Sequence, residues 1–130
     1  MLKTLIRLLA IVAILSGCGN ETTGAITNVS VNEFAKVIET EKVVILDVRT
    51  PAEFMSGHIA GAINIDAESG NFANEIKSLD PNSTYAIYCR SGRRSGVASE
   101  SMADAGFVKI YNMNGGTIDW EAAGFPLTTN

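Results

Sequence analysis

Residues 84–95 read TYAIYCRSGRRS and combine a strand, a cysteine and the start of a helix. Thr84–Tyr88 is composed largely of β-branched and aromatic residues, which is typical of a buried strand. Cys89 follows directly, and the six-residue loop from Cys89 to Arg94 leads into a helix predicted over Ser95–Ala105. Gly106 is expected to end that helix. A strand, a short loop and a helix in this order form the repeating unit of parallel α/β proteins.

The same alternation of strands and helices continues on both sides of this segment. Short loops and right-handed crossovers then favour a parallel sheet covered on both faces, with ligands bound beyond the carboxyl ends of its strands. Cys89 lies at such an end. Further strands are predicted at Ile26–Val29, Val43–Val48, Ala62–Ile65 and Val108–Tyr111, and helical segments after the capping box Ser30–Glu33, over Pro51–Met55, around Phe72–Leu79 and over Thr117–Ala123.

The first 17 residues are expected to be a targeting segment rather than part of the folded domain. Lys3 and Arg7 precede the unbroken apolar run Leu8–Leu15, which is too short for a membrane-spanning helix and typical of a secretory signal peptide. The residues that follow, Leu-Ser-Gly-Cys at 15–18, resemble the lipobox of bacterial lipoproteins, although an ordinary signal peptide with an incidental cysteine has the same general form.

The lipobox resemblance implies that Cys18 becomes the lipid-modified first residue of an exported protein anchored to a bacterial membrane. In a Gram-negative cell this implies that the domain lies on the periplasmic side. An aspartate after the lipidated cysteine usually retains such proteins at the inner membrane, so Gly19 at this position weakly favours the outer membrane. The predicted organisation is a signal peptide over 1–17, the lipidated cysteine with a flexible tether over 18–25, and one domain over 26–130.

Charge and cysteine content exclude several functions. The net charge is −4, and loss of the two cations in residues 1–17 makes it −6, so a nucleic-acid partner is not expected. Two cysteines and one histidine cannot supply the four ligands of a Cys/His zinc site, whereas a site made of carboxylates is not excluded. Once Cys18 is acylated, Cys89 is a lone thiol, which we expect to be exposed and reactive.

The loop after the strand is basic in an otherwise acidic domain. Three of the eight Lys and Arg residues outside residues 1–17 fall within five positions. Amides at a helix N-terminus bind anions and favour a thiolate over a thiol, so the pattern predicts an activated nucleophile and an anionic ligand. The alternative is a buried structural cysteine beside a solvated arginine cluster. The candidate site residues are Cys89, Arg90, Ser91, Gly92, Arg93, Arg94 and Ser95.

This loop resembles the active-site loop C-x-x-G-x-R-S of rhodanese domains. The resemblance covers residues 26–127 in the family's order. It includes DVR at 47–49 with EF at 53–54, GHIAGAINI at 57–65, GF at 106–107, GG at 115–116, Trp120 and GFP at 124–126. It implies a single rhodanese domain, a three-layer α/β/α fold around a mostly parallel five-stranded sheet.

The resemblance also implies the chemistry. In rhodaneses the cysteine takes sulfane sulfur from a donor such as thiosulfate and passes the resulting persulfide sulfur to cyanide or a thiol. Cys89 matches the nucleophile, the amides of residues 90–95 would stabilise the persulfide, and Arg94 matches the family's loop arginine. Arg90 and Arg93 are assigned to attracting a small anionic donor. Neither a metal nor an organic cofactor is expected.

Two other functions remain open at this stage. Cysteine phosphatases and arsenate reductases use a longer C-x5-R loop, and here the arginine comes at C-x4-R. A non-catalytic persulfide relay or binding module would keep the same loop. Outside the loop, His58 and Trp120 are interpreted as structural. Asp47, Arg49 and Glu53 are interpreted as one ion-paired set, more often a fold-stabilising device than a support for the loop.

Overall fold

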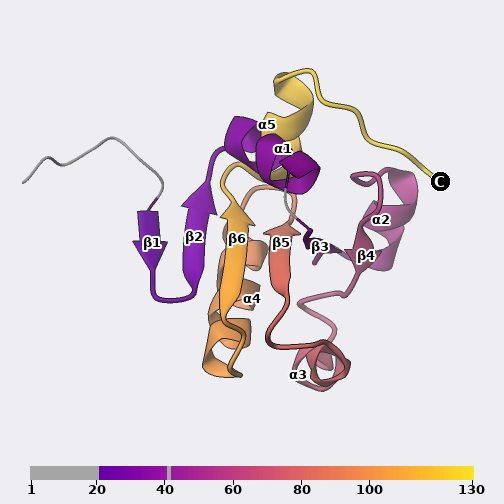
Figure 1. Cartoon of the computed structure of the whole chain (residues 1–130). Helices are drawn as coiled ribbons and strands as arrows, with labels where there is room; N and C mark the ends of the chain where they lie inside the picture. The colour runs from indigo at the N-terminus through magenta and orange to yellow at the C-terminus, as the bar shows by residue number, and fades with distance from the viewer. Residues whose placement is uncertain (1–20, 41) are drawn as a thin grey trace, which may run out of the picture.

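The computed structural model describes residues 21–40 and 42–130. Cys18 and the predicted signal peptide lie outside the described residues. Within them the strands form one sheet in the order β1-β2-β6-β5-β3-β4 (Figure 1). The strands are β1 Glu21–Thr23, β2 Ile26–Val29, β3 Val44–Asp47, β4 Ile63–Asn64, β5 Thr84–Tyr88 and β6 Lys109–Met113.

The five predicted strands are confirmed as a parallel sheet, since β2, β6, β5, β3 and β4 all pair in parallel. The structure adds an antiparallel edge strand that the sequence did not predict. Glu21–Thr23, assigned above to a flexible tether, pairs with β2 across a turn at Gly24. The prediction was wrong there because a polar three-residue edge strand carries no hydrophobic signal of its own.

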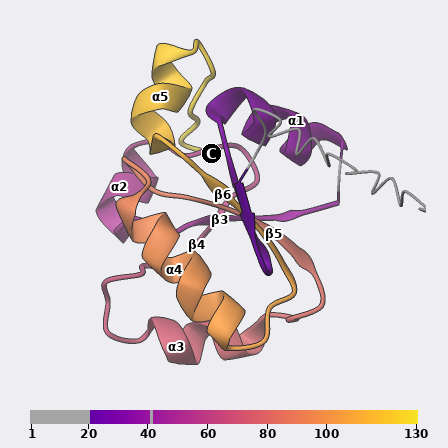
Figure 2. The ribbon, with the colours of Figure 1, turned by 90° about the vertical axis from the view of Figure 1, so that its left-hand side faces the viewer.

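Helices cover both faces of the sheet, as Figure 2 shows with the sheet seen edge-on. α1 and α5 lie on one face and α3 and α4 on the other. Among the described residues, no helix is both long and apolar enough to cross a membrane. The helices are α1 Val31–Thr40, α2 Pro51–Ser56, α3 Phe72–Glu75 continued by a 3₁₀ turn over Ile76–Ser78, α4 Arg93–Asp104 and α5 Gly116–Ala122.

The central strand β5 contributes to both layers of the core, because neighbouring residues of a strand point to opposite faces. Tyr85 and Ile87 pack in the cluster under α4, and Ala86 and Tyr88 pack in the cluster under α1 and α5. Cys89 continues the first series and therefore points towards α4. The alternation in the sequence thus places the thiol beneath the start of that helix.

Candidate active site

The side chain of Cys89 is fully buried at the carboxyl end of β5. The exposed thiol expected from the sequence is therefore wrong, because the side chain has no exposed surface. The loop after Cys89 folds back over the sulfur as it enters α4, and the cysteine also packs within the core cluster beneath that helix. The side chain therefore has no exposed surface in this structure.

Hydrogen bonds within the loop converge on the sulfur. The Gly92 amide donates to Cys89 Sγ at 3.1 Å, and the thiol contacts Ser95 Oγ at 3.4 Å. Burial alone raises the pKa of Cys89, but hydrogen bonds from the Ser95 side chain and from the Ser95, Gly92 and Ser91 amides outweigh it and lower the pKa overall. The loop thus favours the thiolate, the nucleophilic form of cysteine.

Gly92 makes this loop geometry accessible. Its φ of 100° lies in the left-handed region, and its carbonyl accepts the first hydrogen bond of α4, from the Gly96 amide at 3.1 Å. The helix consequently starts at Arg93, two residues before the predicted start at Ser95. Arg93 and Arg94 thus belong to the first helical turn, where the helix dipole disfavours cations unless they are paired.

Arg94 is paired with Glu53 of α2. Arg94 Nη1 and Nη2 donate to the two carboxylate oxygens of Glu53 at 2.7 and 3.0 Å. The same carboxylate completes a capping box with Thr50 at the start of α2. The Arg94 hydrogen bonds, opposed by partial burial and helped by Thr50, lower the pKa of Glu53 to about 2. Glu53 therefore connects α2 to the cysteine loop.

The expected set of Asp47, Arg49 and Glu53 divides into two in the structure. Arg49 binds Asp47 in a buried pair at 2.6 Å and donates to the Gly57 carbonyl, while Tyr88 donates its hydroxyl proton to Asp47 at 2.7 Å. This buried group ties β3 to β5 and stabilises the fold. Of these three residues only Glu53 reaches the loop, through its ion pair with Arg94.

The glycine pair at 115–116, which is quoted above only as part of the family resemblance, packs closely against the cysteine loop. A Cβ atom on Gly116 would come within 2.3 Å of the Arg90 carbonyl and 2.5 Å of the Cys89 oxygen. The Thr117 and Ile118 amides donate to the carbonyls of Cys89 and Arg90 at 3.0 and 3.2 Å. The only signal in the sequence was the adjacent pair Gly115-Gly116 between a strand and a helix.

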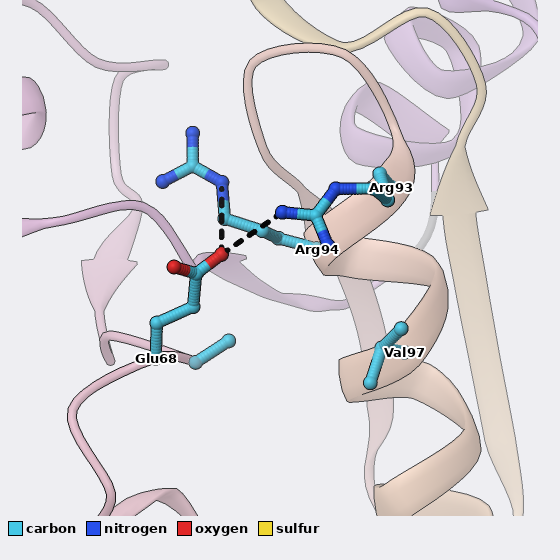
Figure 3. Close-up of a pocket in the computed structure, with 5 residues that line it drawn as sticks. Glu68, Arg93, Arg94 and Val97 are labelled. Carbon is cyan, nitrogen blue, oxygen red and sulfur yellow. Dashed lines mark hydrogen bonds and ion pairs between the residues drawn. The ribbon is translucent and has the colours of Figure 1, made fainter.

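The remaining predicted loop residues lie at the surface. Arg90, Ser91 and Arg93 are exposed, and Arg93 contacts Glu68 at 3.3 Å beside Arg94 (Figure 3). Cys89, Gly92 and Ser95 are brought into contact with one another, whereas Arg90 and Arg93 are not in contact with the sulfur. Their roles in binding and catalysis stay predictions.

Residues interpreted as structural are packed as expected. Trp120 is buried and donates to the Pro126 carbonyl at 2.9 Å. The His58 ring stacks on Phe54 and contacts the backbone oxygens of Phe54 and Asn130 at 2.9 Å each. Both ring nitrogens of His58 therefore have backbone partners within the fold.

Fold and site define a class of protein: a parallel α/β domain in which the amides of a short loop donate to the sulfur of a strand-end cysteine. The family described as "Rhodanese-like domain" matches residues 30–123, and the chain belongs to this rhodanese-like family. Sulfurtransferases are among its relatives.

Two curated relatives carry that activity in their names. The chain is 32% identical over 96 residues to "Thiosulfate sulfurtransferase GlpE" of Shewanella oneidensis, covering 74% of this chain and 93% of that protein. It is 34% identical over 70 residues to "Thiosulfate sulfurtransferase PspE" of Escherichia coli, covering 54% and 67%. Among solved structures, a rhodanese-related protein of Thermoplasma volcanium has a TM-score of 0.70 at 29% identity, covering 79% of this chain and 98% of that one.

A Glu53→Gln variant is expected to lose about 1–2 kcal/mol of unfolding free energy at pH 7, because Arg94 keeps its charge and loses its partner. The folded-state pKa of Glu53 is about 2, below the ordinary 4.5. The pair therefore stabilises the native state fully above pH 4.5 and progressively less as the pH falls towards 2. Urea unfolding at pH 7 and pH 3 measures this, and the gap between variant and wild type should shrink at pH 3. The same loss in Glu75→Gln, an exposed glutamate elsewhere, would contradict this prediction.

Proposed function

We propose that this protein is a thiosulfate-type sulfurtransferase with Cys89 as its nucleophile. The Cys89 thiolate attacks the outer sulfur of thiosulfate, a new S–S bond forms, and sulfite leaves with the electrons of the broken bond. Cyanide or a thiol then attacks the outer sulfur of the Cys89 persulfide, which releases thiocyanate or a new persulfide and regenerates the thiolate. This is ping-pong covalent catalysis.

The observation that carries this proposal is the set of donors around the sulfur of Cys89. The Gly92 amide lies 3.1 Å from Sγ, and hydrogen bonds from the loop lower the pKa of the thiol. Donors fixed before the reaction stabilise negative charge without further reorganisation. The same amides would hold the charged outer sulfur of a persulfide. The named activity of the relatives supports the same reaction.

Mass spectrometry of the intact domain tests the proposal. After incubation of reduced protein with thiosulfate, we expect a gain of one sulfur atom that is lost on addition of cyanide. Protein whose thiol has first been blocked with iodoacetamide should gain nothing. A domain that gains sulfur but gives it up neither to cyanide nor to small thiols would be a relay. An unmodified mass with a thiol that is still alkylatable would refute thiosulfate as donor.

We also propose that the protein is exported and anchored through lipid on Cys18. The support is the charged start, the short apolar run and the Leu-Ser-Gly-Cys sequence at 15–18. Two or three acyl chains hold a protein stably on a membrane. Fractionation of cells producing the full chain should place it with the membranes, and Cys18→Ser should release it from that fraction. Wild-type protein without lipid would overturn the proposal.

A further inference from the structure

A small cavity of about 240 Å³ opens beside the cysteine loop, between residues 67–68 and the first two turns of α4. Its lining consists of Ala67, Glu68, Arg93, Arg94 and Val97. Figure 3 shows the Glu68 carboxylate reaching across this space to both arginines. The volume suits a small ion rather than a bulky organic substrate.

The two arginines of this cavity differ in how strongly they are paired with carboxylates. Arg94 holds Glu53 with two hydrogen bonds, and its side chain is only 16% exposed. Arg93 contacts Glu68 alone among the described residues, and the same Glu68 oxygen lies 4.0 Å from Arg94 Nε. Two cations and two carboxylates therefore balance to zero while Glu68 is in place. Without Glu68 the group carries one net positive charge.

The ion pair between Glu68 and Arg93 is weak because both side chains are exposed to solvent. The side chains of Arg93 and Glu68 are 78% and 56% exposed, and exposed ion pairs contribute about 0–1 kcal/mol. The backbone at Glu68 is nevertheless held, since its amide donates to Asp66 Oδ1 at 2.8 Å and the Ala67 amide donates to the Val48 carbonyl at 3.1 Å. The carboxylate can therefore leave the arginines and still remain nearby.

The cavity is also adjacent to the nucleophile. Arg93 and Arg94 directly follow Gly92, whose amide contacts the Cys89 sulfur. The Arg94 guanidinium lies close enough for a Cys89 thiolate to contribute to the raised pKa of Arg94, together with the larger effect of Glu53. An anion held here would lie beside Arg93 and Arg94, the two residues that directly follow Gly92 in the chain.

We propose that this cavity binds the oxyanion group of the sulfur donor, and that Glu68 is a specificity-determining residue that occupies the position of that group in the resting protein. The inference rests on the proposed sulfurtransferase function. The donor's charged oxygens displace the Glu68 carboxylate from Arg93, so Glu68 sets the concentration at which anionic donors bind. It contributes nothing to the bond-breaking step.

Alkylation of Cys89 tests the proposal without requiring sulfur transfer. Iodoacetate carries a negative charge, and iodoacetamide is a neutral reagent of similar size. The rate of alkylation by iodoacetate divided by the rate with iodoacetamide therefore reports the charge beside the thiol. In Glu68→Gln we expect this ratio to rise about two- to fivefold, the effect of one exposed ion pair. Arg93→Gln should lower the ratio. Glu75→Gln removes the same charge from α3 and should leave it unchanged.

Steady-state kinetics with thiosulfate and cyanide supply the second measurement. In Glu68→Gln the KM for thiosulfate should fall by a larger factor than the alkylation ratio rises, because thiosulfate carries two negative charges and its attraction to the arginines is about twice that of iodoacetate. The value of kcat should not change. An unchanged alkylation ratio in Glu68→Gln, or an equal change in Glu75→Gln, would overturn the proposal. A shifted ratio in a protein that transfers no sulfur would retain the anion site and reject the proposed function instead.

Discussion

Replacing Cys89 with serine is expected to abolish sulfur transfer, with kcat at least about 10³-fold lower than in the wild type. A serine hydroxyl is not ionised at neutral pH and forms no persulfide. The oxygen fits the space of the sulfur and can accept the Gly92 amide proton, so thermal unfolding should change little. Thiocyanate formation from thiosulfate and cyanide gives the rate.

Cys18→Ser is the matched control for this variant, because it replaces the other cysteine of the chain and lies outside the domain that carries the site. It should transfer sulfur at the wild-type rate. The wild-type loading rate should rise with pH and level off, with a midpoint below that of an unperturbed cysteine, since the loop lowers the pKa of Cys89. Transfer by Cys89→Ser above the background rate would contradict the assignment of the nucleophile.

Gly116→Ala is expected to have the second largest effect, a loss of about 2–5 kcal/mol of unfolding free energy together with a fall of about 10²-fold in sulfur transfer. The added methyl group would lie 2.3 Å from the Arg90 carbonyl carbon and oxygen, which are backbone atoms that cannot rotate away. Either α5 or the cysteine loop must shift. Both shifts would weaken the bonds from the Thr117 and Ile118 amides to the loop carbonyls.

Gly124→Ala separates the steric effect from backbone strain. Gly124 also has a positive φ, 86°, but no atom lies within 4 Å of an added Cβ. It should cost only the conformational penalty of about 1–2 kcal/mol and retain sulfur transfer. Urea unfolding and the thiocyanate assay on both variants make the comparison. Equal losses in the two variants would show that the contact of Gly116 with the loop is unimportant.

The parallel sheet and the position of the thiol could be predicted from local sequence because both depend on neighbours along the chain. Alternation in Thr84–Tyr88 sends Tyr85, Ile87 and Cys89 to one face and Ala86 and Tyr88 to the other. The glycine at 92 permits the left-handed turn that starts α4. Glu21–Thr23 lacked any such local signal, and its strand was missed because edge pairing depends on the neighbouring strand rather than on its own side chains.

The partners of the loop were decided by the tertiary structure. Glu53 lies 41 residues before Arg94 in the chain, and Glu68 lies 25 before Arg93. Gly116 of α5 packs against the backbone carbonyls of Cys89 and Arg90. Nothing in the local sequence around a glutamate or a glycine indicates which distant residue it will contact in the folded protein. The parallel register of β3 and β5, with Asp47 opposite Tyr88, brings the ends of both strands and the loops after them to one edge of the sheet. Sequence alone therefore predicted Cys89 as the nucleophile, whereas three-dimensional packing decided the burial of its side chain, the lowering of its pKa and the charges around it.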